Sequence, residues 1–172
     1  CAEWQHNITP VQQQVKIFRD ILLYIQDQLG SDSFNQIYWS VENNTLGEAA
    51  LVAITEYGED RIPGIFISEP GGKRRGFNTT HKSKLPACAK FKHWVESDKM
   101  LISSKNLVRE IKNFVAHGNS FAAKSGETDD LVMSLILIVR MAQMLQSFDS
   151  QLDYTMKDSL EDIVEPMPFF IS

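Results

Sequence analysis

An almost wholly apolar helix that begins with two adjacent acids constrains this chain more than any other sequence feature. Residues Leu131–Leu145 carry few polar side chains, and a helix that is apolar on most of its surface is a buried one. Asp129 and Asp130 stand in its predicted first turn, and Thr128 before them is a typical N-cap residue. The sequence therefore predicts a buried central helix with two acids in its first turn.

The two acids have two interpretations. Negative charge in the first turn is favourable because it faces the positive end of the helix dipole. Capping of this kind accounts for one carboxylate better than for two, since adjacent carboxylates repel each other and a buried helix offers little water to disperse their charge. A divalent cation would relieve the repulsion. Both capping and metal binding stay open from this segment, and a metal site requires another acid elsewhere in the chain.

Glu42 is the candidate for that additional acid. It follows Ile37–Val41, a β-branched and aromatic run that predicts a strand. Asn43, Asn44 and Gly47 then break the strand before an Ala-rich predicted helix, residues 48–57. Glu42 thus stands at the carboxyl end of a predicted parallel strand, the edge where ligands bind in open α/β sheets. The alternative is a solvated acid at the end of a strand.

A basic segment, Gly71–Lys84, lies in the middle of this acidic chain; we call it the basic loop. It contains no acid, and its cationic side chains are Lys73, Arg74, Arg75, Lys82 and Lys84. Such a cluster favours contact with phosphates, and we expect Phe77 within it to lie against a sugar or base. A solvated loop is the alternative. Because the predicted strand Ile65–Ser68 precedes it, the loop is expected to emerge at the same sheet edge as Glu42.

Composition limits the class of protein. With 172 residues, 43% of them hydrophobic, the chain is expected to form one globular domain, and no apolar run is long enough to span a bilayer. The net charge of −5 argues against a protein that coats nucleic acid generally, but not against an enzyme with a local basic patch. Cys1 and Cys88 have neither disulfide-framework nor zinc-ligand spacing, which predicts reduced thiols in a cytoplasm.

The remaining elements follow from periodicity and helix-boundary residues. Helices are predicted over Pro10–Leu29, Pro86–Ser97 and Lys105–Val115, and short strands over Ala2–Gln5, Met100–Ile102 and Ser120–Ala123. Thr9 is the expected N-cap of the first helix. Helices that alternate with short strands predict a three-layer α/β fold with a central mixed sheet flanked by helices. No repeat or linker divides the chain, so we expect one domain over residues 1–146 and a tail over residues 147–172.

Two segments carry a resemblance to a known family. Val41–Gly47 and Thr128–Ser134 resemble the second and third acidic motifs of the carboxy-terminal nuclease domain of the large terminase subunit of tailed bacteriophages, most closely the T-even-like myoviruses. The basic loop and Phe121–Ala123 also fit this pattern. The resemblance covers roughly residues 1–146. It implies a ribonuclease H-like or resolvase-like nuclease fold.

The resemblance also implies a function. That function is metal-dependent endonucleolytic cleavage of double-stranded, concatemeric DNA during genome packaging in the cytoplasm of an infected bacterial host. Carried over by position, Glu42 is the second metal-binding acid and Asp130 the third, with Asp129 as a second or outer ligand of one or two Mg²⁺ or Mn²⁺ ions. Glu42 and Asp130 are then expected to lie close enough to share a hydrated ion. The implied partners are the portal, the small terminase subunit and an ATPase domain of the same protein, with no membrane.

The chain departs from the family pattern at its amino end. The family's first acid lies on a strand upstream of Ala2–Gln5, and Glu3 falls on the second strand instead. No GxxxxGK[ST] phosphate loop occurs either. We therefore expect a fragment that lacks the first strand, the first catalytic acid and the ATPase, and whose cleavage is impaired in isolation. The alternatives are a catalytically incomplete DNA- or protein-binding module, or another nuclease of the superfamily such as a resolvase.

Overall fold

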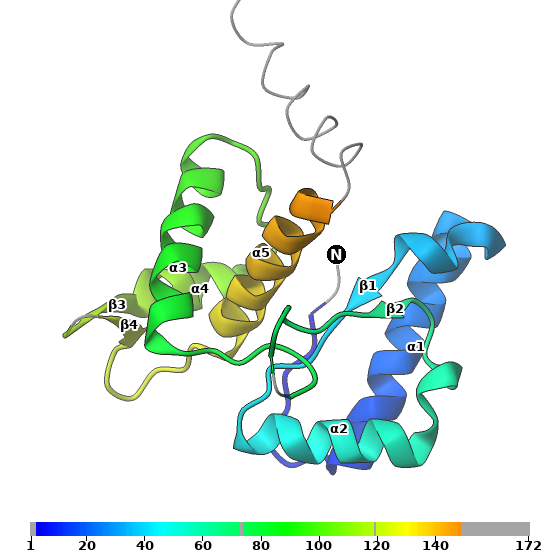
Figure 1. The fold of residues 1–172 in the computed structure, drawn as a ribbon. Helices are drawn as coiled ribbons and strands as arrows, with labels where there is room; N and C mark the ends of the chain where they lie inside the picture. Colours follow the sequence, from blue (N-terminus) through cyan, green and yellow to red (C-terminus); the bar gives the residue numbers. More distant parts are fainter. Residues whose placement is uncertain (1–2, 73, 119, 149–172) are drawn as a thin grey trace, which may run out of the picture.

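The structure is a computed structural model that describes residues 3–72, 74–118 and 120–148 (Figure 1). Within these ranges the chain forms a mixed α/β fold that is rich in helix and has small sheets. The α-helices are α1 (Val11–Leu29), α2 (Thr45–Tyr57), α3 (His81–Glu96), α4 (Lys105–Asn113) and α5 (Asp130–Phe148). The 3₁₀ helices are η1 (Ser31–Gln36) and η2 (Glu59–Arg61). The strands are β1 (Tyr38–Trp39), β2 (Ile65–Phe66), β3 (Phe114–His117) and β4 (Ser120–Ala123).

The first sheet is parallel, as predicted, but short. β1 pairs with β2 in the register Tyr38 to Ile65 and Trp39 to Phe66. Parallel pairing continues past the strands through an isolated bridge between Glu42 and Phe77. The expectation that the basic loop emerges beside Glu42 is therefore confirmed.

The second sheet is the antiparallel hairpin β3–β4, which pairs Phe114 with Ala123 and His117 with Ser120. It confirms the predicted strand Ser120–Ala123. It also shortens the predicted helix over residues 105–115, because α4 ends at Asn113 and the chain then enters β3. Among the described residues the two sheets are separate, so one central mixed sheet is not seen.

The helices divide into two groups, α1 with α2 and α3 with α4 and α5 (Figure 1). α1 packs on α2, and their apolar side chains join Trp39 of β1 in one core cluster. α5 packs on α3 and α4 in the other group. Val132, Ile136 and Val139 of α5 are almost fully buried, which confirms the prediction of a buried helix after the acids.

Two predicted strands are wrong. Residues 3–5 and 100–102 have no regular secondary structure, while Cys1 and Ala2 lie outside the described residues. Residues 3–5 form side-chain contacts with α4 and α5 in place of a backbone ladder: Glu3 accepts a hydrogen bond from Asn106, and Gln5 donates one to Asp130.

Several helix boundaries differ from those predicted. Pro10, not Thr9, occupies the N-cap position of α1. α3 begins at His81, five residues before Pro86, because Thr80 and Ser83 form a capping box. Lys82 and Lys84 therefore belong to a helix and not to the loop.

α5 continues to Phe148, two residues into the segment predicted as a tail. Residues 149–172 of that tail lie outside the described residues. In the part of the chain that the structure describes, no helix is both long and apolar enough to cross a membrane.

Candidate carboxylate site

A cavity of about 640 Å³ collects the acids that the sequence analysis selected. Glu42 lines it from the end of the β1 segment, and Asp129 and Asp130 line it from the start of α5. Lys84 of α3 also reaches this cavity. Apolar side chains from α1, α2 and α5 form much of the remaining wall. Residues that are far apart in sequence thus meet around one space, which we call the carboxylate cavity.

Glu42 is held by the turn that joins β1 to α2. Asn44 donates a hydrogen bond from Nδ2 to Oε2 of Glu42 at 3.1 Å, and its Oδ1 accepts one from the backbone N–H of Gly47 at 2.9 Å. A Cβ atom on Gly47 would lie 1.7 Å from the carbonyl oxygen of Glu42, so only glycine allows this close approach. The spacing of the Val41–Gly47 motif therefore fixes the position of Glu42 relative to α2.

Asp129 and Asp130 are adjacent but bind different segments. Oδ2 of Asp130 accepts a hydrogen bond from Nε2 of Gln5 at 3.0 Å. Oδ2 of Asp129 accepts one from the backbone N–H of Ala123, the last residue of β4, at 3.3 Å. Both side chains line the carboxylate cavity.

Glu110 of α4 caps α5, a role that was not predicted from the sequence. This carboxylate is only 6% exposed. Its Oε2 accepts hydrogen bonds from the backbone N–H groups of Leu131 at 2.8 Å and Val132 at 3.1 Å. Its Oε1 accepts from the Thr128 hydroxyl at 3.0 Å and from Gln5 at 3.4 Å. Thr128 is therefore a donor to the capping carboxylate and not the N-cap that the sequence predicted.

A signal for Glu110 exists in the sequence. It is the only acid in the segment 105–113 and lies three residues after Leu107 and directly before Ile111, on the face of α4 that packs into the core. An acid on the apolar face of a short helix requires a partner for its charge. The partner, however, is the N-terminus of a helix about twenty residues away, which periodicity does not identify.

None of the cations that the structure describes lies within ion-pair distance of an acid of the carboxylate cavity. Among the residues that the structure describes, Glu42, Asp129 and Asp130 take part in no salt bridge, and the hydrogen bonds above come from amide groups. Lys84 lines the same cavity, but its ammonium group lies over the Phe114 ring, 5.1 Å from the centroid. The described residues that line the cavity include three acids and one lysine, so the net charge of the lining is negative.

The arginines of the basic loop have acidic partners. Arg74 forms an ion pair with Glu48 of α2, and Nη2 of Arg75 lies 2.6 Å from Oε2 of Glu59 of η2. Arg75 also lies over the ring of Phe66, 4.5 Å from its centroid. Both arginines are at least half exposed. Lys82 is exposed in the first turn of α3, whereas Lys73 lies outside the described residues.

Phe77 is a core residue. Only 2% of it is exposed, and it packs with Ile67 and Met141 beneath the guanidinium group of Arg140, which is 5.1 Å from the ring centroid. The expectation that Phe77 lies against a sugar or base is wrong. The parallel bridge to Glu42 places its side chain inside the fold, although its neighbours in sequence are basic and polar.

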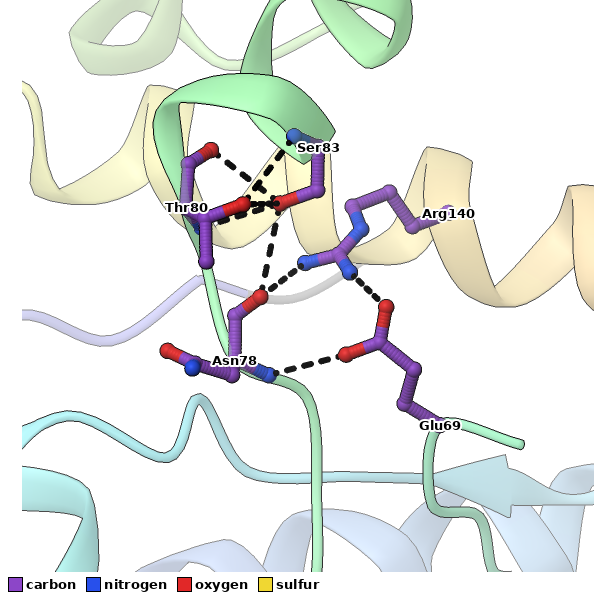
Figure 2. A network of polar contacts seen from close by, with 5 residues as sticks. All are labelled: Glu69, Asn78, Thr80, Ser83 and Arg140. Atoms are coloured by element: carbon purple, nitrogen blue, oxygen red, sulfur yellow. Dashed lines mark hydrogen bonds and ion pairs between the residues drawn. The ribbon is translucent and has the colours of Figure 1, made fainter. Parts of the chain in front are cut away.

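Arg140 of α5 ties down the base of the basic loop (Figure 2). It donates hydrogen bonds to Oε1 of Glu69 at 2.7 Å and to the carbonyl oxygen of Asn78 at 3.2 Å. The backbone N–H of Asn78 in turn donates to Oε2 of Glu69 at 3.4 Å. The residues on both sides of the loop tip are therefore attached to the helix that carries Asp130.

The oxygen ligands around the carboxylate cavity suit a hard cation such as Mg²⁺ or Mn²⁺. Within the described residues, no three or more His, Cys, Asp or Glu side chains are gathered so that together they could hold a metal ion. Mg²⁺ does not require such a cage, because it is usually bound by one or two carboxylates and keeps several waters. Glu42 and Asp130 line the same cavity, and a hydrated ion shared between them stays a prediction.

Cys88 does not contribute to the site. It is buried in the core between α3 and α5, and this burial raises the pKa of its thiol. A protonated, inaccessible thiol serves as a small apolar side chain.

The sequence of this chain matches no model of a known protein family.

Proposed function

We propose that this chain is the nuclease domain of a viral DNA-packaging terminase large subunit and cleaves double-stranded, concatemeric DNA with Mg²⁺ or Mn²⁺. One observation carries the proposal: Glu42, Asp129 and Asp130 line one cavity and have neutral hydrogen-bond partners in place of cations. On this proposal, the parallel β1–β2 pair and its flanking helices belong to a ribonuclease H-like fold. The wider partners, namely the portal, the small terminase subunit and an ATPase domain, and the host cytoplasm follow from the same resemblance.

Each residue has a defined role in this proposal. Glu42 and Asp130 hold the divalent ion, and Asp129 supplies a second or outer ligand. The bound ion would stabilise the charge of the scissile phosphate and lower the pKa of an attacking water. Glu110 fixes the first turn of α5 and so the position of Asp130. Lys84 contributes positive charge at the cavity, where a phosphate would approach.

Cleavage of a long linear DNA duplex by the full-length protein tests the proposal. We expect products with Mg²⁺ or Mn²⁺ and none with EDTA. Glu42→Gln should abolish cleavage, since the amide keeps the shape of the carboxylate but removes its charge. Asp27→Asn is the matched control, because Asp27 is exposed on α1 and does not line the cavity. Cleavage that persists in EDTA or in Glu42→Gln would overturn the proposal.

One observation favours a second candidate, a DNA- or protein-binding module without chemistry. The acids line a common cavity, but within the described residues they do not form a group of three that could hold a metal. The two candidates differ in their use of the ion: a binding module should bind DNA equally with Mg²⁺ and with EDTA and release no products. A resolvase would cleave four-way junctions in preference to linear duplex.

A further inference from the structure

We propose that the exposed face of α4 is a second surface for the phosphate backbone of DNA. Lys105, Arg109 and Lys112 are spaced by four and three residues, so they stand on one face of the helix, and all three are exposed. Lys124 follows β4 and is exposed as well; its backbone N–H donates to the carbonyl oxygen of Asn113 at the end of α4. We call these four residues the α4 basic face.

Most of the charge on this face is positive. Glu110 is the only acid in α4, and it is buried on the opposite side, under the start of α5. In the described part of the chain, Lys105, Lys112 and Lys124 take part in no salt bridge. Arg109 forms one with Glu127 at 3.1 Å and is still 73% exposed. Three cations of the face are therefore available for anions in solution.

The α4 basic face is attached to the carboxylate cavity through two sets of contacts. Glu3 accepts hydrogen bonds from Ser104 and Asn106 at the start of α4, and two residues later Gln5 donates to Asp130. From the inner side of the same helix, Glu110 holds the first turn of α5. These contacts connect α4 to the start of α5, so a duplex bound to the α4 basic face is positioned relative to Asp130. This inference rests on the proposed function for its choice of DNA as the ligand.

The composition of the face favours a nucleic-acid backbone over a protein partner. Interfaces between proteins are anchored by aromatic and large apolar side chains in buried pockets. The four residues of the α4 basic face are all long cations, and the exposed large apolar side chain nearest to them in sequence is Leu101, four residues before Lys105. A row of cations that attracts anions without buried anchors is typical of contact with phosphates, which does not depend on base sequence.

The test measures binding of a 30-base-pair duplex in EDTA, from low to moderate salt, so that cleavage plays no part. The variant Lys105→Ala/Lys112→Ala/Lys124→Ala removes the three unpaired cations. The control Lys16→Ala/Lys90→Ala/Lys92→Ala makes the same change in net charge on α1 and α3. Thermal unfolding of both variants confirms that they are folded.

We expect the variant to lower the log–log salt slope by about 0.9 for each lost phosphate contact, and the control to leave the slope unchanged. Equal loss in both triple variants would show that only net charge matters, and an unchanged slope would show that the face does not touch the duplex; either result overturns the proposal. Loss of binding to polyglutamate with unchanged DNA binding would assign the face to an acidic protein and also overturns it. If the α4 variant has a lower salt slope but the wild-type protein never cleaves DNA, the α4 basic face binds DNA and the proposed nuclease function is wrong.

Discussion

The carboxylate cavity and the basic loop both stand out in the sequence as clusters of like charge, yet their surroundings in the structure differ. The three acids Glu42, Asp129 and Asp130 line one cavity and accept hydrogen bonds from amide groups. Among the described residues they form no salt bridge. Arg74 and Arg75 meet acids from α2 and η2. A cluster that keeps its excess charge attracts a counterion, whereas a paired cluster has little excess left.

This comparison changes where we expect ligands to bind. The basic loop contains no acid in sequence, but the fold supplies Glu48 and Glu59 from elsewhere. The α4 basic face is less conspicuous in sequence, and within the described residues three of its four cations take part in no salt bridge. We therefore expect ligands to bind where charge is unpaired in space and not where it is only clustered along the chain.

Asp130→Asn should have the largest effect. We expect a loss of DNA cleavage greater than the roughly 100-fold typical of an outer-shell partner, because the amide removes the charge that holds the metal. Asp129→Asn should cost less, since Asp129 is assigned to a second or outer position. Single-turnover cleavage of duplex DNA by the gene-encoded protein measures both. A severe loss in Asp129→Asn with normal cleavage in Asp130→Asn would reverse the assignment.

Phe77→Ala should have the largest effect on stability among the changes in the basic loop. Removing a buried Phe side chain costs about 3–5 kcal/mol of unfolding free energy, through lost burial and the cavity left behind. Urea unfolding of the variant, beside Arg74→Ala as a surface control, measures the difference. A variant as stable as the wild type would mean that Phe77 is exposed and free to lie against DNA.

Glu110→Gln should lower stability by about 1–3 kcal/mol. A glutamine has one acceptor oxygen in place of two. At least one of the buried donors from Thr128, Leu131 and Val132 therefore loses its hydrogen-bond acceptor. Glu127→Gln is the matched control, since its exposed salt bridge to Arg109 contributes about 0–1 kcal/mol. Equal stabilities of the two variants would show that Glu110 does not cap α5.

Replacement of the basic-loop cations should have the smallest effect. Lys73→Ala/Arg74→Ala/Arg75→Ala would lower the salt slope of DNA binding by nearly three units if each side chain touched a phosphate. Because Arg74 and Arg75 already contact Glu48 and Glu59, we expect a smaller change than that. Equilibrium binding in EDTA at several salt concentrations measures it. A full change of three units would show that these ion pairs open when DNA binds.

Sequence patterns predicted the parts of the fold that depend on local order. The runs at Ile37–Val41 and Ile65–Ser68 contain the parallel strands, and the apolar run after Asp130 forms a buried helix. These predictions succeed because alternation, β-branching and apolar length act within one segment.

The errors come from residues whose environment is set by distant segments. Phe77 is surrounded by polar residues in sequence and is buried because its backbone pairs with Glu42. Glu110 becomes a cap because the α5 N-terminus lies beside it, and the partners of Arg74 come from another helix. No local pattern contains these contacts.

Binding of Mn²⁺, measured by titration calorimetry on the gene-encoded protein, tests the central claim most directly. We expect the wild type and the control Asp27→Asn to bind the ion with equal affinity, and Glu42→Gln and Asp130→Asn each to bind it at least about tenfold more weakly, because each loses a charged ligand. A wild type that does not bind Mn²⁺, or a Glu42→Gln variant that binds it as tightly as the wild type, would contradict the assignment of the carboxylate cavity as a metal site.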